Sequence, residues 1–216
     1  MIKNEFIKRF FSSAILIPIT LFIIIEGSFL FIFFILISLM LATYEWLKMS
    51  KSDIQKILGL FFLIISFYTI FKIRNDFNND YFHILFVAIV CVSTDVGGYI
   101  FGKLFKGPKL TKLSPNKTYT GVIGSFLIPI IITNLFFELP LNIYNFEYSK
   151  ETLVFVLIIS LVSQIGDIII SFFKRLSKIK DTGNIIPGHG GILDRIDGMI
   201  FAYPFSYLVF LNWNFQ

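Results

Sequence analysis

Long apolar runs alternate along the chain with short polar segments. Seven apolar runs can be read from the sequence, at about 10–25, 28–47, 57–73, 82–102, 121–139, 152–170 and 198–213. Most are near the roughly 20 residues that a helix needs to cross a bilayer, and several are at the lower limit. The pattern predicts an all-α fold: a polytopic integral membrane helix bundle of about seven transmembrane helices, with residues 1–216 forming one membrane-embedded domain.

Composition excludes a soluble globular protein. The chain is 56% hydrophobic and 15% charged, with a mean hydropathy of +0.78, whereas an ordinary soluble domain has about 25% charged residues. One small core cannot bury all 28 Phe residues, but lipid solvates them freely. The single cysteine, Cys91, lies in an apolar run, which excludes a disulfide framework and a cysteine metal cluster.

The distribution of basic residues predicts how the chain crosses the membrane. If the N-terminus is cytoplasmic, 16 of the 19 Lys and Arg residues lie in the inner segments 1–9, 48–56, 103–120 and 171–197. This asymmetry predicts an N-in, C-out orientation by the positive-inside rule. It also accounts for the net charge of +5, so a nucleic-acid partner is not expected. Trp46, at the inner end of the second run, is expected at the headgroup layer.

Loop 103–120 is one of two inner segments in which polar residues concentrate. It carries five lysines and no acid, and it ends in Ser114-Pro115-Asn116-Lys117-Thr118-Tyr119-Thr120-Gly121 before a new apolar run. A helix entered after Ser and Thr presents free amides to an anion. A positive-inside loop followed by an ordinary helix cap explains the same residues equally well.

A carboxylate interrupts the fourth apolar run. Asp95 lies about two turns before Lys103, at a depth where inserting a carboxylate costs ~2.5–3.5 kcal/mol. Asp95 therefore needs either a function or a partner within the bundle. Gly98 and Gly102 follow on the same face and indicate that another backbone or a ligand comes close.

The sixth run carries a polar stripe along one helical face. Its members follow a spacing of three or four residues: Ser160, Gln164, Asp167, Ser171, Lys174 and Lys178. Such a stripe faces protein or water rather than lipid. It is compatible with a membrane transporter or lipid carrier that uses intramembrane carboxylates, which is the alternative to an enzyme.

Residues 180–198 combine glycines, basic residues and carboxylates. Exposed amides in a Gly-rich turn cradle phosphate oxygens, which basic side chains can neutralise. Asp194 and Asp197 share one face if helical, and with Asp167 they form an oxygen-only set suited to Mg²⁺. The glycines around His189 fit a hydrogen-bonding role for this side chain in the turn at least as well as they fit acid–base catalysis. Together these features indicate phosphoryl or nucleotidyl transfer.

Within this region the sequence resembles the signature of the phosphatidate cytidylyltransferases, also called CDP-diacylglycerol synthases. The matching residues are Ser171, Lys174-Arg175, Lys180-Asp181, Gly183, Pro187, His189-Gly190-Gly191, Asp194-Arg195 and Asp197. Two further matches extend the resemblance toward the N-terminus: Ser163–Asp167, and Asp95 together with the 114–118 motif. The resemblance then covers about residues 93–198. The chain departs from the family pattern at Asn116, Tyr119-Thr120 and Ile170.

The resemblance implies an enzyme of phospholipid biosynthesis. Such an enzyme transfers CMP from CTP to phosphatidic acid, with Mg²⁺ as cofactor, and releases CDP-diacylglycerol and pyrophosphate. By this resemblance Lys180, Asp181 and Arg195 are catalytic, and Asp167, Asp194 and Asp197 bind the metal, with Asp95 either a further ligand or part of a structural pair. The residues expected to bind substrate are Lys117, Ser171, Lys174, Arg175, His189, Gly190 and Gly191.

The predicted topology sets the expected location of the site, and the resemblance sets the expected substrates. Loop 103–120 and segment 171–197 are expected to form one cationic pocket on the cytoplasmic face of the membrane, which is the inner membrane if the source is bacterial. CTP, phosphatidic acid and membrane lipids are the expected partners. A homodimer is left open.

Overall fold

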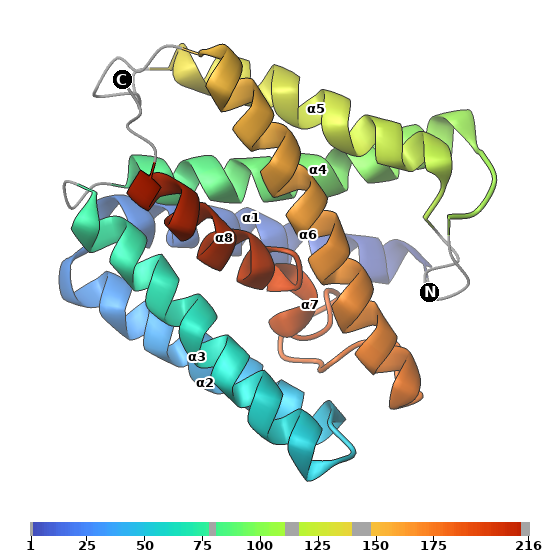
Figure 1. The fold of residues 1–216 in the computed structure, drawn as a ribbon. Coiled ribbons are helices and arrows are strands. Elements are labelled where there is room, and N and C mark those ends of the chain that lie inside the picture. Colours follow the sequence, from blue (N-terminus) through green and yellow to red (C-terminus); the bar gives the residue numbers. More distant parts are fainter. Residues whose placement is uncertain (1, 78–80, 111–116, 140–147, 213–216) are drawn as a thin grey trace. The chain divides into compact units, whose positions relative to one another are not determined.

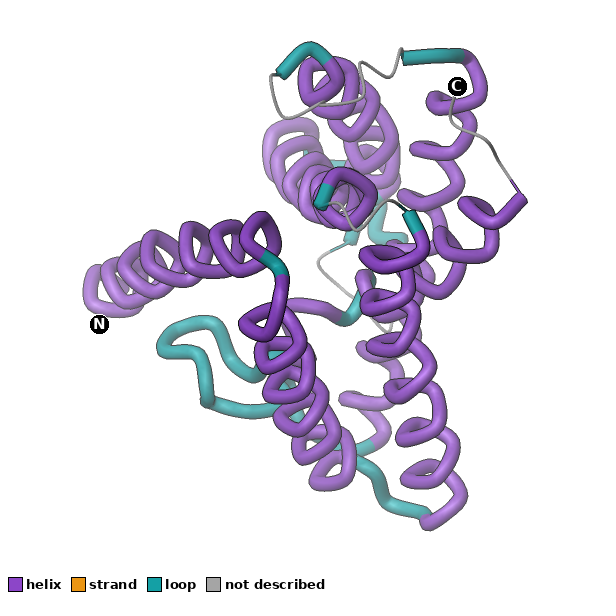
Figure 2. The backbone as a smooth tube through the Cα atoms, turned by 90° about the vertical axis from the view of Figure 1, so that its left-hand side faces the viewer, coloured by secondary structure: helices purple, strands orange, loops and turns teal. Residues whose placement is uncertain are grey.

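The chain is almost entirely helical where the structure describes it. The computed structural model describes residues 2–77, 81–110, 117–139 and 148–212, with side chains from residue 11 onward. The predicted motif residues Ser114, Pro115 and Asn116 lie outside these ranges. In the described residues regular structure is helical, without strands, apart from two isolated β-bridges (Figures 1 and 2).

Eight helices account for the described regular structure. They are α1 (Ile2–Glu26), α2 (Ser28–Met49), α3 (Asp53–Asp76), α4 (Phe82–Phe105), α5 (Tyr119–Phe137), α6 (Lys150–Leu176), α7 (Leu193–Ile196) and α8 (Met199–Asn212). Each of the seven predicted apolar runs coincides with a helix, which confirms the all-α fold. Five helices, α2 to α6, are long and apolar enough to cross a membrane, and the apolar parts of α1 and α8 are shorter. The chain is thus an α-helical integral membrane protein, and the total of seven spans stays a prediction.

The helices group into two compact units. Unit 1 comprises Met1–Tyr81 and Phe173–Asp197, and unit 2 comprises Phe82–Phe172 and Gly198–Gln216. Helix α6 is continuous through the change of unit at Phe172 and Phe173.

In unit 1, α2 lies beside α3 and also contacts α1 and the short helix α7 (Figure 1). The link between α2 and α3 is closed by a capping box, in which the Ser52 hydroxyl accepts from Gln55 N (3.3 Å) and the Gln55 side chain accepts from Ser52 N (3.4 Å). Trp46 is 5% exposed and donates Nε1–H to Gln55 O (3.1 Å). The indole of Trp46 lies against Gly59 of α3, in the space that a larger side chain at Gly59 would fill, and the position of Trp46 at the headgroup layer stays a prediction.

In unit 2, α4 and α5 pack closely through glycines. A Cβ at Gly97 would collide with Gly124 O, and one at Gly124 would lie 2.5 Å from Gly97 O. At Gly98 and Gly102 the nearby groups also belong to the start of α5, with Gly121 O and Gly121 Cα each 3.8 Å from the added carbon. The close approach predicted at Gly98 and Gly102 is confirmed, and the nearest groups are the Ser125 and Thr118 hydroxyls, with the α5 backbone just beyond them.

Candidate functional site

The Gly-rich loop, residues 177–192, connects α6 to α7 in unit 1. It begins at Lys178, whose positive φ of 57° ends α6. Further on, His189 N donates to Ile186 O (2.9 Å) across Pro187 and Gly188. Pro at the second position and Gly with φ 75° at the third are the requirements of a type II turn. Gly190 (φ 90°) then accepts from Ile186 N (2.9 Å), so this part of the loop is a narrow, backbone-bonded turn.

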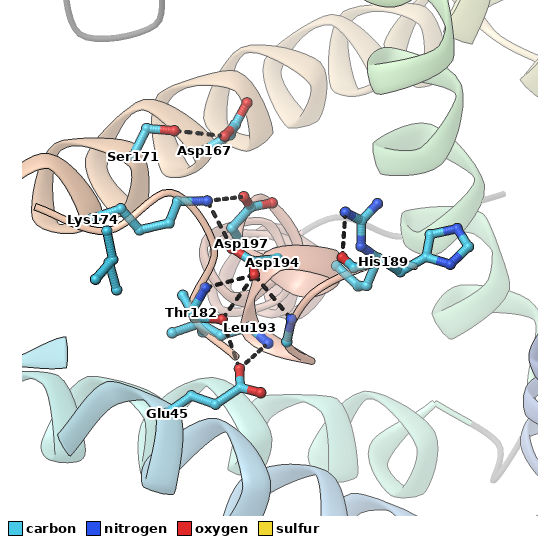
Figure 3. Close-up of polar contacts among 12 residues, drawn as sticks. Glu45, Asp167, Ser171, Lys174, Thr182, His189, Leu193, Asp194 and Asp197 are labelled. Carbon is cyan, nitrogen blue, oxygen red and sulfur yellow. Dashed lines mark hydrogen bonds and ion pairs between the residues drawn. The ribbon is translucent and has the colours of Figure 1, made fainter. Parts of the chain in front are cut away.

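A buried ion pair joins the end of α6 to α7. Lys174 Nζ lies 2.9 Å from Asp194 Oδ1 and 3.9 Å from Asp197 Oδ2 (Figure 3). The three side chains are 11%, 4% and 12% exposed, respectively. The expectation that Asp194 and Asp197 share one helical face agrees with this arrangement, because one ammonium group meets both carboxylates.

The second oxygen of Asp194 binds the Gly-rich loop. Asp194 Oδ2 accepts from Thr182 N (2.7 Å), Gly191 N (3.0 Å) and Thr182 Oγ1 (3.0 Å). Burial raises the pKa of the Asp194 carboxyl, but the hydrogen bonds from Lys174 and the two amides together hold this pKa below its usual value. Asp194 is therefore ionised at neutral pH.

Glu45 of α2 is a site residue that the sequence analysis missed. It is 1% exposed, and its carboxylate accepts from Thr182 Oγ1 (2.8 Å), Ile192 N (3.0 Å) and Leu193 N (2.9 Å) (Figure 3). We call Glu45, Lys174, Thr182, Asp194 and Asp197 the buried polar network. The argument applied to Asp95, that a carboxylate within an apolar run needs a partner or a function, would also have singled out Glu45.

Two signature glycines lie against Glu45. A Cβ at Gly183 would lie 2.7 Å from Glu45 Oε1, and one at Gly191 would collide with both Glu45 oxygens and with Thr182 Oγ1. Glycine is needed at these positions because the Glu45 carboxylate fills the space that a side chain would occupy. Gly190 is needed for its backbone conformation as well, since φ is +90°.

His189 and Arg195 stabilise the turn. Ser12 Oγ of α1 lies 2.8 Å from His189 Nδ1, and Ser13 Oγ lies 3.2 Å from His189 Nε2. Arg195 Nη2 donates to His189 O (2.9 Å). These contacts agree with the hydrogen-bonding role expected of His189.

The other charged candidates of unit 1 lie at the surface. Lys180 and Asp181 are exposed on the loop, and Arg175 is exposed and donates to Ile179 O (3.4 Å). They surround the loop with charge that substrates can reach, unlike the buried Lys174.

Unit 2 contains the remaining candidates. Lys117 Nζ lies 2.5 Å from Asp167 Oδ2. Ser171 Oγ donates to Asp167 Oδ1 (3.2 Å) (Figure 3). Asp95 lies on the exposed side of α4. In the predicted polar stripe of α6, Ser160 is fully buried in protein.

Metal binding is left open by this geometry. Among the residues that the structure describes, no three His, Cys, Asp or Glu side chains gather closely enough to hold a metal ion. The chemistry of the donors still fits Mg²⁺, because Asp194 and Asp197 direct hard oxygen atoms toward one cation position, and Mg²⁺ often binds proteins through one or two carboxylates.

Comparison with known proteins gives a consistent match. The model of the family described as "Cytidylyltransferase family" matches residues 54–213. The chain is 34% identical to a protein of Rickettsia conorii named phosphatidate cytidylyltransferase, over 96% of this chain and 92% of that protein. Proteins of the same name from Rickettsia typhi and Bacillus subtilis are 35% and 34% identical, covering 94% and 79% of this chain and 90% and 64% of their own lengths.

Replacing Lys174 tests the buried ion pair. Lys174→Met keeps most of the side-chain volume but leaves the Asp194 carboxylate without its cation, so we expect a loss of ~3–5 kcal/mol in the free energy of unfolding. Unfolding in detergent, without substrates, measures this. The adjacent Arg175→Met removes an exposed charge and should change stability by less than about 0.5 kcal/mol. Equal losses in the two variants would contradict the buried pair.

Proposed function

Because this chain belongs to the cytidylyltransferase family, as the residues from Ser171 to Asp197 predicted, we propose that it is a phosphatidate cytidylyltransferase. It transfers CMP from CTP to phosphatidic acid and forms CDP-diacylglycerol and pyrophosphate. The observation that carries the proposal is the Gly-rich loop of this membrane protein. Its charged side chains at the surface are exposed, and the buried polar network holds its backbone in place. The transporter alternative is not favoured, because the matching proteins are named cytidylyltransferases.

The reaction needs little covalent chemistry from the protein. A phosphate oxygen of phosphatidic acid attacks the α-phosphorus of CTP, the bond from that phosphorus to the bridging oxygen breaks, and its electron pair leaves with pyrophosphate. Both reactants are anions, so the site must above all reduce their repulsion and orient them.

The exposed basic residues of unit 1 fit that task. Lys180 and Arg175 present charge at the loop surface. A guanidinium group has five N–H donors, so Arg195 can hold the His189 carbonyl and still contact a phosphate oxygen. Lys174 acts differently, because its buried ammonium keeps Asp194 and Asp197 in place.

We assign Mg²⁺ binding to Asp194 and Asp197 on their donor chemistry, and the metal-binding roles expected of Asp167 and Asp95 stay predictions. A bound Mg²⁺ ion would neutralise phosphate oxygens of CTP. Lys117 and Ser171 both contact Asp167, so they can orient its carboxylate. The role of Lys117, Ser171, His189, Gly190 and Gly191 in substrate binding stays a prediction, as does a homodimer.

We place the active site on the cytoplasmic face, with the N-terminus inside and the C-terminus outside. The distribution of Lys and Arg supports this orientation, since 16 of 19 lie in the segments assigned to the inside. A site at this surface would receive CTP from water and phosphatidic acid from the lipid layer.

Product analysis tests the activity. Purified protein given labelled CTP, phosphatidic acid and Mg²⁺ should form labelled CDP-diacylglycerol. Lys180→Gln should lower kcat/KM by an amount equivalent to ~1.5–3 kcal/mol, the value of a charge-assisted contact. The controls Lys51→Gln and Lys56→Gln alter one exposed and one half-buried lysine outside the loop and should change kcat/KM little. If the controls cost as much as Lys180→Gln, the lysines act through general membrane charge and the assigned role of Lys180 is wrong.

Cysteine labelling tests the orientation. In a chain carrying Cys91→Ser, cysteines introduced at Lys109 and Lys178 should react with a membrane-impermeant reagent from the cytoplasmic side only. The assay compares intact inside-out and right-side-out vesicles. Labelling of the two positions from opposite sides would rule out a shared cytoplasmic site.

A further inference from the structure

We propose that Glu45 is a positioning residue for the transfer reaction: from α2, it holds the Gly-rich loop and the start of α7 in the geometry that places Asp194. This inference rests on the proposed function. Glu45 lies outside the signature and before residues 54–213, which the family model matches. It is separated by 137 residues from Thr182 and by 148 from Leu193, yet it contacts both.

The first argument is the burial of a charge. A carboxylate that is 1% exposed is expensive to bury unless hydrogen-bond donors replace its water. Here the donors include two backbone amides, of Ile192 and Leu193, and the Thr182 hydroxyl, and all three belong to the loop and its junction with α7. Any movement of the loop away from α2 would remove donors from a buried charge. The free energy of the buried Glu45 carboxylate therefore depends directly on the loop conformation.

The second argument is the cap that Glu45 gives to α7. Ile192 is the N-cap residue of this helix and has no side-chain cap of its own. A helix of four residues is too short to be stable alone. Glu45 accepts from the amides of Ile192 and Leu193, and a carboxylate at this end is also favoured by the helix dipole. Because α7 carries Asp194 and Arg195, the cap fixes the element on which they lie.

The third argument is a direct connection to Asp194. Thr182 Oγ1 lies 2.8 Å from Glu45 Oε2 and 3.0 Å from Asp194 Oδ2. A hydroxyl has a single hydrogen to donate, so the Glu45 and Asp194 carboxylates share or compete for the same donor. The position of Asp194 is thus coupled to that of Glu45 through one hydroxyl group.

The fourth argument is the fit of the loop around Glu45. Gly183 and Gly191 leave no room for a Cβ beside the carboxylate. Two signature glycines are therefore explained by a residue outside the signature. The loop is built around Glu45 as much as around its own turns.

The test compares Glu45→Gln with the control Glu26→Gln, an exposed acid in the same unit. Gln has nearly the shape of Glu but no charge. Its NH₂ group cannot accept hydrogen bonds, so at least one donor of the loop would lose its acceptor. We expect Glu45→Gln to lower kcat for CDP-diacylglycerol formation by about 10- to 100-fold, measured per mole of folded protein recovered by size-exclusion chromatography. A purely structural role would lower the yield of folded protein and leave this normalised kcat unchanged.

A double-mutant cycle tests the bridge through Thr182. Thr182→Val keeps the shape of the side chain and removes the hydroxyl. If Glu45 acts through Thr182, the double variant should be no more than about 3-fold slower than the slower single variant, because both disrupt one unit. Effects of Glu45→Gln and Thr182→Val that multiply would overturn the coupling. If Glu45→Gln yields no folded protein, a normalised kcat of Thr182→Val equal to wild type would overturn it as well.

The outcomes separate this inference from the proposed function. Wild-type protein that makes no CDP-diacylglycerol would refute the function and with it the role of Glu45. Active wild-type protein with Glu45→Gln as fast as Glu26→Gln would refute the role of Glu45 alone.

Discussion

The structure of unit 1 depends on how buried carboxylates are kept in hydrogen bonds. Glu45 and Asp194 are both removed from water, and an unpaired charge there would be very costly. Lys174 supplies one counter-charge, and the amides of Thr182, Gly191, Ile192 and Leu193 supply the remaining donors described. The Gly-rich loop is therefore ordered by the charges it surrounds, although it contains little regular structure.

This arrangement separates two tasks within one short segment. Lys174, Thr182 and Asp194 face inward and set the backbone path, whereas Lys180 and Asp181 remain exposed. A site that must bring two phosphorylated anions together benefits from such a division, because its exposed charges stay available while the loop beneath them keeps its shape. Two signature lysines therefore have different roles: Lys174 holds the buried carboxylates in place, and Lys180 keeps its charge at the surface.

The fold was largely predictable because the apolar runs are long and lipid imposes helical structure on them. The helix ends were predicted less accurately. The sixth apolar run ends at about 170, but α6 continues to Leu176 because the residues of its polar stripe are helical too. The packing of Trp46 against α3 was not predictable, because position at the end of a run says nothing about which side of the helix meets α3. The sequence could have marked Glu45 as a carboxylate in an apolar run, as it marked Asp95, but only folding brings it to Thr182 and Leu193. Local motifs, in contrast, predicted a Gly-rich turn within residues 180–198 and the shared face of Asp194 and Asp197.

The central claim is that the buried carboxylates order the Gly-rich loop before any substrate binds. Hydrogen exchange at single-amide resolution, on wild-type protein in lipid nanodiscs without substrates, tests this most directly. The amides of Thr182, Gly191, Ile192 and Leu193 should exchange far more slowly than those of the exposed residues Asn184 and Ile185. Exchange of all six amides at the same fast rate would contradict the claim.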